Sequence, residues 1–223
     1  MNRLNSYRGV SALLSAAVLA LVLPARAGTN NFVVPSFRGS AGSSVAGWER
    51  FTVATDNGVG NSPDIVGSNA AAKFVQRDPN AFVTSTGNIY NMAGKSVFEV
   101  SYSNAGPVGR VVFQSRSFGT ELDYSSVKLT YGSVSIDAAR TELDRLLVGE
   151  PGTPGSGAFV SSKWEWDLSG SGATTFKLGF NAVSDSLSFD SATLDIATVP
   201  EPTTVVLVGV GLAGLWFIGS RRR

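Results

Sequence analysis

Residues 97–102 read Val-Phe-Glu-Val-Ser-Tyr, near the middle of a 223-residue chain, and apolar and polar side chains alternate from Phe98 to Tyr102. Successive side chains of an extended strand point to opposite faces, so Phe98, Val100 and Tyr102 would share one buried face. The same period of two recurs at 110–114, 127–131, 164–168, 176–180 and 192–196, with weaker candidates at 48–53, 73–75 and 81–84. The short segments between these runs are rich in Gly, Asn, Ser and Pro. The pattern predicts an all-β body, an antiparallel β-sandwich or jelly roll.

The apolar positions of these runs define the expected core. It would include Phe98, Val100, Phe113, Leu129, Tyr131, Trp166, Phe176, Leu178, Phe180 and Leu194. With 43% apolar residues, the chain has enough hydrophobic surface to form a single packed core.

One stretch favours a helix instead of a strand. Asp137 can cap its start, and Gly149 followed by Pro151 can end it. Apolar side chains between these signals recur at helical intervals: Ala139, Leu143, Leu146 and Leu147. We expect one short helix here, lying across an open end or edge of the sandwich.

Composition excludes several classes of chemistry. The chain has no Cys and no His, which excludes a Cys/His zinc site, a thiol nucleophile, a disulfide framework and any His-based triad. Six of the 18 basic residues lie in 1–27 and 221–223, which leaves 12 in the body. Of the 17 acidic residues, only Glu201 lies outside the body, which leaves 16. The body therefore carries a net charge of about −4 and lacks the basic footprint of a nucleic-acid-binding protein.

Residues 1–27 have the pattern of a secretory signal peptide. Arg3 and Arg8 precede an apolar run over 10–23, and Ala25 and Ala27 form a small-x-small cleavage site before Gly28. The alternative is an uncleaved N-terminal anchor, although the run is short for a membrane span. We expect export by the Sec machinery, and the mature body over 28–198.

The C-terminus is organised in three parts. Pro200-Glu201-Pro202 is followed by an apolar run over 203–220, and Arg221, Arg222 and Arg223 end the chain. A helix of 18 residues would cross about 27 Å. The arginines would keep the C-terminus in the cytoplasm. We expect a single transmembrane helix in the inner membrane, and the two prolines would hold Glu201 in an extended, accessible segment.

This arrangement resembles the PEP-CTERM sorting signal of Gram-negative and related bacteria over residues 199–223. The resemblance implies an exported protein whose tail is recognised by an exosortase, a membrane-embedded protease, and is removed on the way to the cell surface or exopolysaccharide matrix. A plain C-terminal anchor is the alternative, but it would not require Pro-Glu-Pro. Tails of this kind are also called the ice-binding protein C-terminal domain. Ice binding would need a flat, regular Thr array, and the Thr residues here show no repeat.

Two segments of the body are similar to uncharacterised PEP-CTERM surface proteins. They are 37–51, with Trp48 in an expected first strand, and the Asp-containing last strand at 187–196. The resemblance implies that these strands bracket a jelly roll, and it implies no activity.

An oxygen-rich loop at 56–64 is a candidate calcium site. Asp56, Asn57, Asn61 and Asp64 supply the hard oxygen ligands that calcium prefers. The spacing does not match an EF-hand, and an Asx/Gly turn is the simpler interpretation.

Glu165 and Asp167 are the candidate catalytic carboxylates. They lie two apart on one strand face, about 7 Å from each other, which fits the separation used by glycosidases. Neighbouring acidic side chains on an exposed strand usually have no catalytic role and only keep that face of the sheet in contact with water. Trp164 and Trp166 would lie on the opposite face, in the core or as a sugar-stacking platform, and Trp48 has the same two interpretations.

These observations favour a non-enzymatic surface or matrix protein that binds exopolysaccharide and no cofactor. The alternative is a carboxylate-dependent glycan hydrolase on a jelly-roll scaffold.

Overall fold

The computed structural model describes residues 31–65, 69, 71–153 and 155–199. Within these ranges the chain forms strands and no helix. The strands are β1 (Ser43–Trp48), β2 (Lys73–Gln76), β3 (Phe82–Val83), β4 (Ile89–Asn91), β5 (Val97–Ser103), β6 (Val108–Gly119), β7 (Leu122–Tyr131), β8 (Val134–Asp137), β9 (Thr141–Val148), β10 (Gly157–Asp167), β11 (Thr175–Ala182) and β12 (Leu187–Thr198). The prediction of an all-β body is confirmed.

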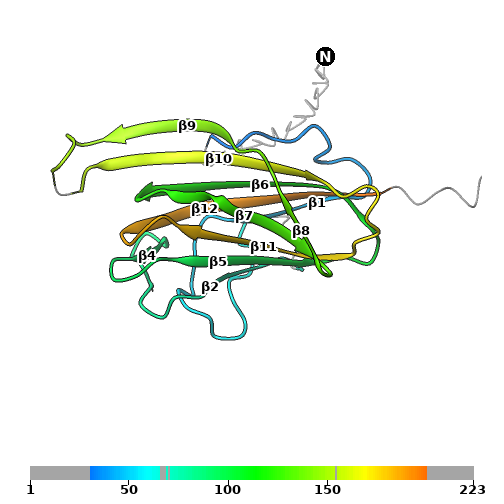
Figure 1. Ribbon diagram of the computed structural model, residues 1–223, viewed down its shortest axis with the longest axis horizontal. Coiled ribbons are helices and arrows are strands. Elements are labelled where there is room, and N and C mark those ends of the chain that lie inside the picture. Colours follow the sequence, from blue (N-terminus) through cyan, green and yellow to red (C-terminus); the bar gives the residue numbers. More distant parts are fainter. Residues whose placement is uncertain (1–30, 66–68, 70, 154, 200–223) are drawn as a thin grey trace, which may run out of the picture.

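The strands form two antiparallel sheets that lie one above the other (Figure 1). Sheet A has the order β3-β4-β12-β6-β10-β9, with β1 also paired to β12, and sheet B has the order β2-β5-β11-β7-β8. Residues Ser43 to Trp48 pair with Ala197 to Ala192, so the first strand of the body lies beside the last. The two ends of the body therefore lie side by side in sheet A.

The alternating run at 97–102 becomes β5 in sheet B. Phe98 lies opposite Phe180 and Val100 opposite Leu178 on β11, and all four side chains are buried. Of the predicted core, only Tyr131 is partly exposed, because it ends β7 directly before the turn at Gly132. Among the weaker candidates, 48–53 is wrong beyond Trp48, since β1 ends there.

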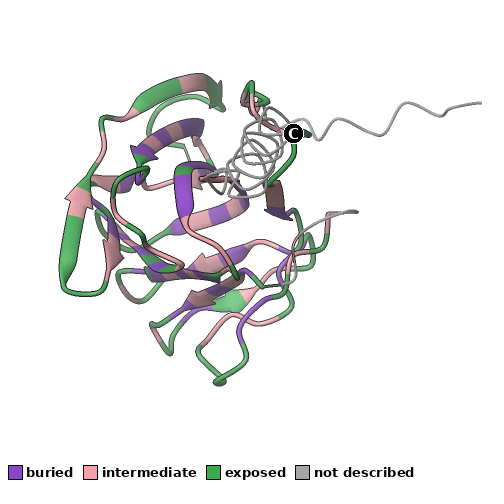
Figure 2. Cartoon of the chain, turned by 90° about the vertical axis from the view of Figure 1, so that its right-hand side faces the viewer, coloured by how far each residue is buried: buried purple, intermediate pink, exposed green. Residues whose placement is uncertain are grey.

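Aromatic rings fill the space between the sheets. The ring of Phe74 lies 5.0–6.1 Å from those of five neighbours, measured between centroids: Trp48, Phe51, Phe98, Phe180 and Phe189. Offset and tilted ring pairs at such distances add to the stabilisation from apolar burial. In Figure 2 the buried segments lie along the strands and most exposed ones in loops.

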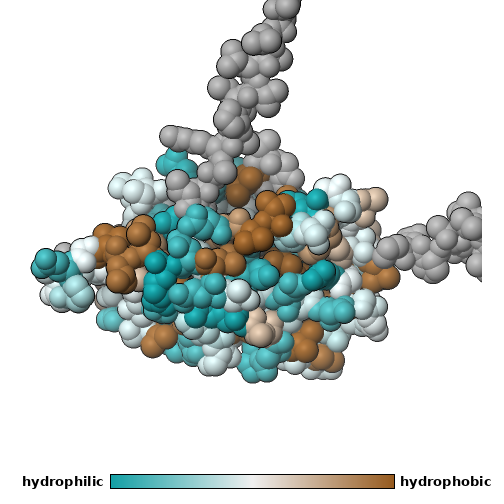
Figure 3. Space-filling model, turned by 90° about the horizontal axis from the view of Figure 1, so that it is seen from above, coloured by the Kyte–Doolittle hydropathy of each residue, from teal (hydrophilic) through white to brown (hydrophobic). Residues whose placement is uncertain are grey.

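The helix expected over 137–148 is wrong. Asp137 ends β8, which pairs with β7, and Thr141–Val148 forms β9 at the edge of sheet A. Leu146 and Leu147 are exposed, Leu147 by 72%, and apolar side chains gather at the end of the β9–β10 hairpin, at the left of Figure 3. Pairing with β10 overrides the local helical spacing, and a bulge at Ser161/Ser162 accommodates the irregular pattern.

The segment before β1 covers the outer face of sheet A. The side-chain amide of Gln114 on β6 accepts a hydrogen bond from the backbone N–H of Val33 (2.8 Å) and donates one to its carbonyl (2.9 Å). Arg38 donates from Nε and Nη2 to the fully buried carboxylate of Asp195 on β12, at 2.5 and 2.7 Å. Burial raises the pKa of Asp195, and Arg38 opposes that rise. Residues 31–38 thus act as a strap on this sheet, and we refer to them as the strap.

Removing the Arg38 side chain should destabilise the body in a pH-dependent way. Arg38→Ala leaves a buried carboxylate without its partner, which we expect to lower the free energy of unfolding by about 3 kcal/mol near neutral pH. Without the guanidinium, the pKa of Asp195 in the folded state rises further above its unfolded value. The loss should therefore be greatest above that raised pKa and should shrink as the pH falls towards the unfolded pKa.

Denaturant unfolding of residues 28–199 across the acidic to neutral range measures this effect. The matched control is Arg38→Ala combined with Asp195→Asn, which has no carboxylate to titrate at this position. A loss of stability that is equal at acidic and neutral pH would contradict the assignment.

Candidate functional site

The outer face of sheet B presents two rows of residues, most of them polar, to solvent. The register places Lys73, Ser101, Lys177 and Thr130 in one row across β2, β5, β11 and β7. The next row holds Glu99, Gly179 and Lys128 on β5, β11 and β7. We refer to the surface formed by these two rows as the open face.

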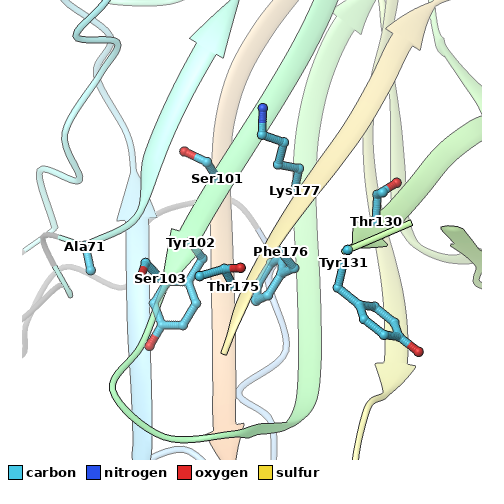
Figure 4. Close-up of a pocket in the computed structure, with 10 residues that line it drawn as sticks. Ala71, Ser101, Tyr102, Ser103, Thr130, Tyr131, Thr175, Phe176 and Lys177 are labelled. Atoms are coloured by element: carbon cyan, nitrogen blue, oxygen red, sulfur yellow. The ribbon is translucent and has the colours of Figure 1, made fainter. Parts of the chain in front are cut away.

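Two adjoining hollows lie on the open face. One, of about 350 Å³, is bordered by Ser101, Thr175 and Tyr131 (Figure 4). The other, of about 500 Å³, extends over Glu99, Lys128 and Gly179. Thr130 and Lys177 line both, so the two hollows form one groove across the strands.

Gly179 forms part of the floor of the groove. A Cβ atom built at this position meets no other atom within 4 Å, and the backbone is not in the left-handed region. A side chain at 179 would therefore rise into the groove from a strand that can accept it. The absence of a side chain here deepens the groove between Glu99 and Lys128.

The groove carries side chains of both charges. Three of the five lysines of the chain lie on the open face. Glu99 accepts a charged hydrogen bond from Arg77 at 3.0 Å and pairs with Lys177 at 3.3 Å. Lys128 pairs with the exposed Asp137 at the rim, at 3.2 Å. Glu99 thus contacts two cations, Arg77 and Lys177. Arg77 also pairs with Asp56, as Lys128 does with Asp137.

The sequence predicted the strands of the groove but not the groove itself. Lys128 and Lys177 occupy polar positions in the alternating runs 127–131 and 176–180, so the pattern did indicate that they would face away from the core. Gly179 gave no separate signal.

The candidate carboxylates lie on the other sheet. Glu165 and Asp167 are on β10 and face outward, where they border a hollow of about 460 Å³ beside the end of β12. Glu165 forms an ion pair with Arg110 and lies 3.7 Å from Lys163. Hydrogen bonds from Ser169 lower the pKa of Asp167. Asp167 is thus held as a carboxylate, which is the form of a glycosidase base or nucleophile and not of its acid.

All three tryptophans considered as platforms are buried. Trp164 packs at 6.0 Å from Phe113, and the indole N–H of Trp166 donates to the carbonyl of Ile136 at 3.2 Å. Trp48 donates in the same way to Asn61 at 3.1 Å. The structure places them in the core, and the platform alternative is wrong.

Each of the proposed calcium ligands forms hydrogen bonds or an ion pair with other groups of the protein. Asp56 forms an ion pair with Arg77, and Asp64 accepts hydrogen bonds from the backbone N–H groups of Glu49 and Arg50, both at 2.8 Å. Asn61 is buried, and its amide oxygen accepts from Thr52 and Val53. Among the described residues no cluster of three or more acidic side chains with metal-site geometry occurs. The hydrogen bonds of Asp56 and Asn57 to Gly58, Val59 and Gly60 are those of Asx turns.

The predicted sorting and targeting residues lie outside the described ranges. These are Ala25, Ala27 and Gly28 of the cleavage site, the Pro200-Glu201-Pro202 motif, the expected membrane helix at 203–220 and Arg221 to Arg223. In the part of the chain that the structure describes, no helix has the length and apolar character needed to cross a membrane.

Comparison with known proteins identifies the end of the chain. A family model of the PEP-CTERM protein-sorting motif matches residues 198–223. The match confirms the resemblance seen in the sequence, and it implies an exported protein whose sorting partner is an exosortase. Neither the curated proteins nor the solved structures contain a significant match to the chain.

Proposed function

We propose that the chain is a non-enzymatic protein of the cell surface or extracellular matrix, which an exosortase sorts and whose body binds exopolysaccharide. The observation that carries the sorting part is the PEP-CTERM motif at 198–223. In this proposal, residues 1–27 direct export and are removed. Residues 203–220 hold the precursor in the inner membrane with Arg221 to Arg223 in the cytoplasm, until the tail is cut.

The groove on the open face supports the binding part. Hydroxyl, ammonium and carboxylate groups line it at close intervals, and these are the groups that hydrogen-bond to sugar hydroxyls. The groove runs across several strands and is open to solvent, so an extended polymer can lie in it without a change in the fold. Exported proteins at the cell surface meet polysaccharide as an abundant polymer.

The surroundings of Glu165 and Asp167 support a non-enzymatic role. One carboxylate is paired with Arg110, and the other has a lowered pKa. The alternative, a glycan hydrolase, requires turnover that Glu165→Gln and Asp167→Asn abolish. Incubating the protein with the exopolysaccharide of its host and measuring new reducing ends tests this alternative.

Gly179→Trp should weaken binding to polysaccharide. The indole would fill the groove between Glu99 and Lys128 while the core beneath it stays unchanged, because no atom lies in the way. We expect affinity for the exopolysaccharide of the host strain to fall at least about tenfold. Co-sedimentation of the body with purified exopolysaccharide measures it.

The matched control is Gly170→Trp in the β10–β11 loop, where a Cβ also meets no atom within 4 Å. This variant should bind as the unchanged protein does. If the unchanged protein and both variants bind equally well, the binding surface lies elsewhere. If none of them binds, the proposal that the body binds polysaccharide is wrong.

A further inference from the structure

The sorting motif begins inside the folded body. The matched residues start at Thr198, which is also the last residue of β12. The backbone N–H of Thr198 donates to the carbonyl of Gly42 at 3.0 Å, and that of Val199 donates to Pro107 at 2.9 Å. Pro200 follows directly. The body therefore holds the chain up to the residue before Pro-Glu-Pro.

The reach of the motif from the body is short. An extended chain advances at most about 3.6 Å per residue, so Pro202 lies within about 11 Å of Val199 in any conformation. Val199 is fixed at the end of a strand that β6 flanks on one side and β1 on the other. An enzyme that binds Glu201 must consequently approach the end of the body that surrounds Val199.

Three segments lie beside the end of β12, at 39–42, 104–107 and 168–174. Hydrogen bonds join them: Asn104 N–H donates to Thr174, and Val108 N–H donates to Ala173, at 2.9 and 2.7 Å. The Thr198 hydroxyl also donates to Gly42 at 3.0 Å. A Cβ at Gly42 would lie 2.4 Å from that hydroxyl, so the close contact requires glycine. We call these three segments together the exit face.

The exit face has small side chains and no charge. Its residues are Gly, Ser, Ala, Asn, Pro and Thr, with the buried Leu168 as the one large side chain. The loops at the opposite end of the sheets differ, since each carries a charged side chain: Lys95, Glu121, Glu150 and Asp185. Charged side chains lie beside this face, because Arg110, Glu165 and Asp167 border the hollow next to Thr198 and Val199. The exit face itself has short side chains and therefore offers little steric obstruction to an enzyme that binds the motif.

We propose that the exit face is the surface against which the sorting enzyme docks when it binds Pro200-Glu201-Pro202. The inference rests on the proposed sorting function and adds that the body takes part in recognition. Pro200 follows Val199 directly, with no spacer between the body and the motif. Short, uncharged side chains on the exit face leave room for the enzyme to reach the motif. The occupant is the exosortase itself, because the motif brings that enzyme within about 11 Å of Val199.

Bulk on the exit face should slow tail removal, and a spacer should restore it. Gly106→Trp and Gly170→Trp add a ring where a Cβ meets no atom within 4 Å, at ordinary backbone angles. In the full-length precursor, expressed in a host with the exosortase, we expect each to slow conversion to the mature form about tenfold. A flexible Gly-Ser insertion between Val199 and Pro200, about 12 residues long, should return both variants to the rate of the unchanged precursor.

Val183→Trp is the matched control, because Val183 is 59% exposed in the β11–β12 loop at the opposite end of the sheets, and it should be processed at the unchanged rate. Pulse-chase labelling measures all rates, and resistance of each precursor to added protease confirms folding. Unchanged rates for both exit-face variants, or slow rates that the insertion does not restore, would overturn the inference while leaving sorting intact. If the unchanged precursor keeps its tail in this host, the proposed function fails, and the docking surface fails with it.

Discussion

Replacement of Phe74 by alanine is expected to lower the free energy of unfolding by about 3–5 kcal/mol. Phe74 is fully buried on β2, and its ring contacts those of Trp48, Phe51 and Phe189 as well as two rings of sheet B. The loss combines apolar burial with a cavity that rigid aromatic neighbours cannot fill. Small domains commonly have only about 5–15 kcal/mol of total stability, so the variant would have lost a large share of it.

Urea unfolding of residues 28–199, followed by tryptophan fluorescence, measures the change. Phe82→Ala is the matched control, because Phe82 lies on the edge strand β3 and is 42% exposed. Among the residues that the structure describes, its ring pairs with that of Tyr90 alone, so the loss should be only about 1 kcal/mol. A loss as small for Phe74 as for Phe82 would contradict the packing of β2 onto sheet A.

The strands and most of the core could be predicted because alternation is a local signal. Phe98, Val100, Leu178 and Phe180 repeat with a period of two and lie in register on β5 and β11. Leu143, Leu146 and Leu147 show the limit of that signal. Their spacing fits one face of a helix equally well. This segment is a strand because it pairs with β10, and that pairing leaves no mark in the spacing of the leucines.

The open face could not be predicted because both sheets have polar outer positions. Which of the two stays uncovered depends on the strap, and the strap is held by contacts between residues distant in the sequence. Arg38 and Asp195 are 157 residues apart, and Val33 and Gln114 are 81 apart. The sorting motif needed no such information, since its three parts are contiguous.

Glu201→Ala is expected to block tail removal almost completely. The exchange leaves the apolar run at 203–220 and Arg221 to Arg223 unchanged, so the precursor should still be exported and held in the membrane. It removes the acidic group of the Pro-Glu-Pro motif, which we expect the exosortase to recognise. Glu150→Ala, in the β9–β10 loop, is the control that removes one exposed carboxylate elsewhere and should be processed normally.

Accumulation of full-length Glu201→Ala protein in the membrane fraction, detected by an antibody against the body, measures the block. Normal conversion of this variant to the mature form would show that the exosortase does not recognise Glu201. Loss of the protein from the membrane without conversion would show that the exchange disturbs insertion instead.

The most direct test of the account is the intact mass of the protein from two otherwise identical strains, one with the exosortase and one without. We predict that both proteins lack residues 1–27, and that only the protein from the exosortase-bearing strain also lacks the tail from about Pro202 onward. The same intact tail in both strains would contradict the account, because the C-terminus would then be a plain membrane anchor.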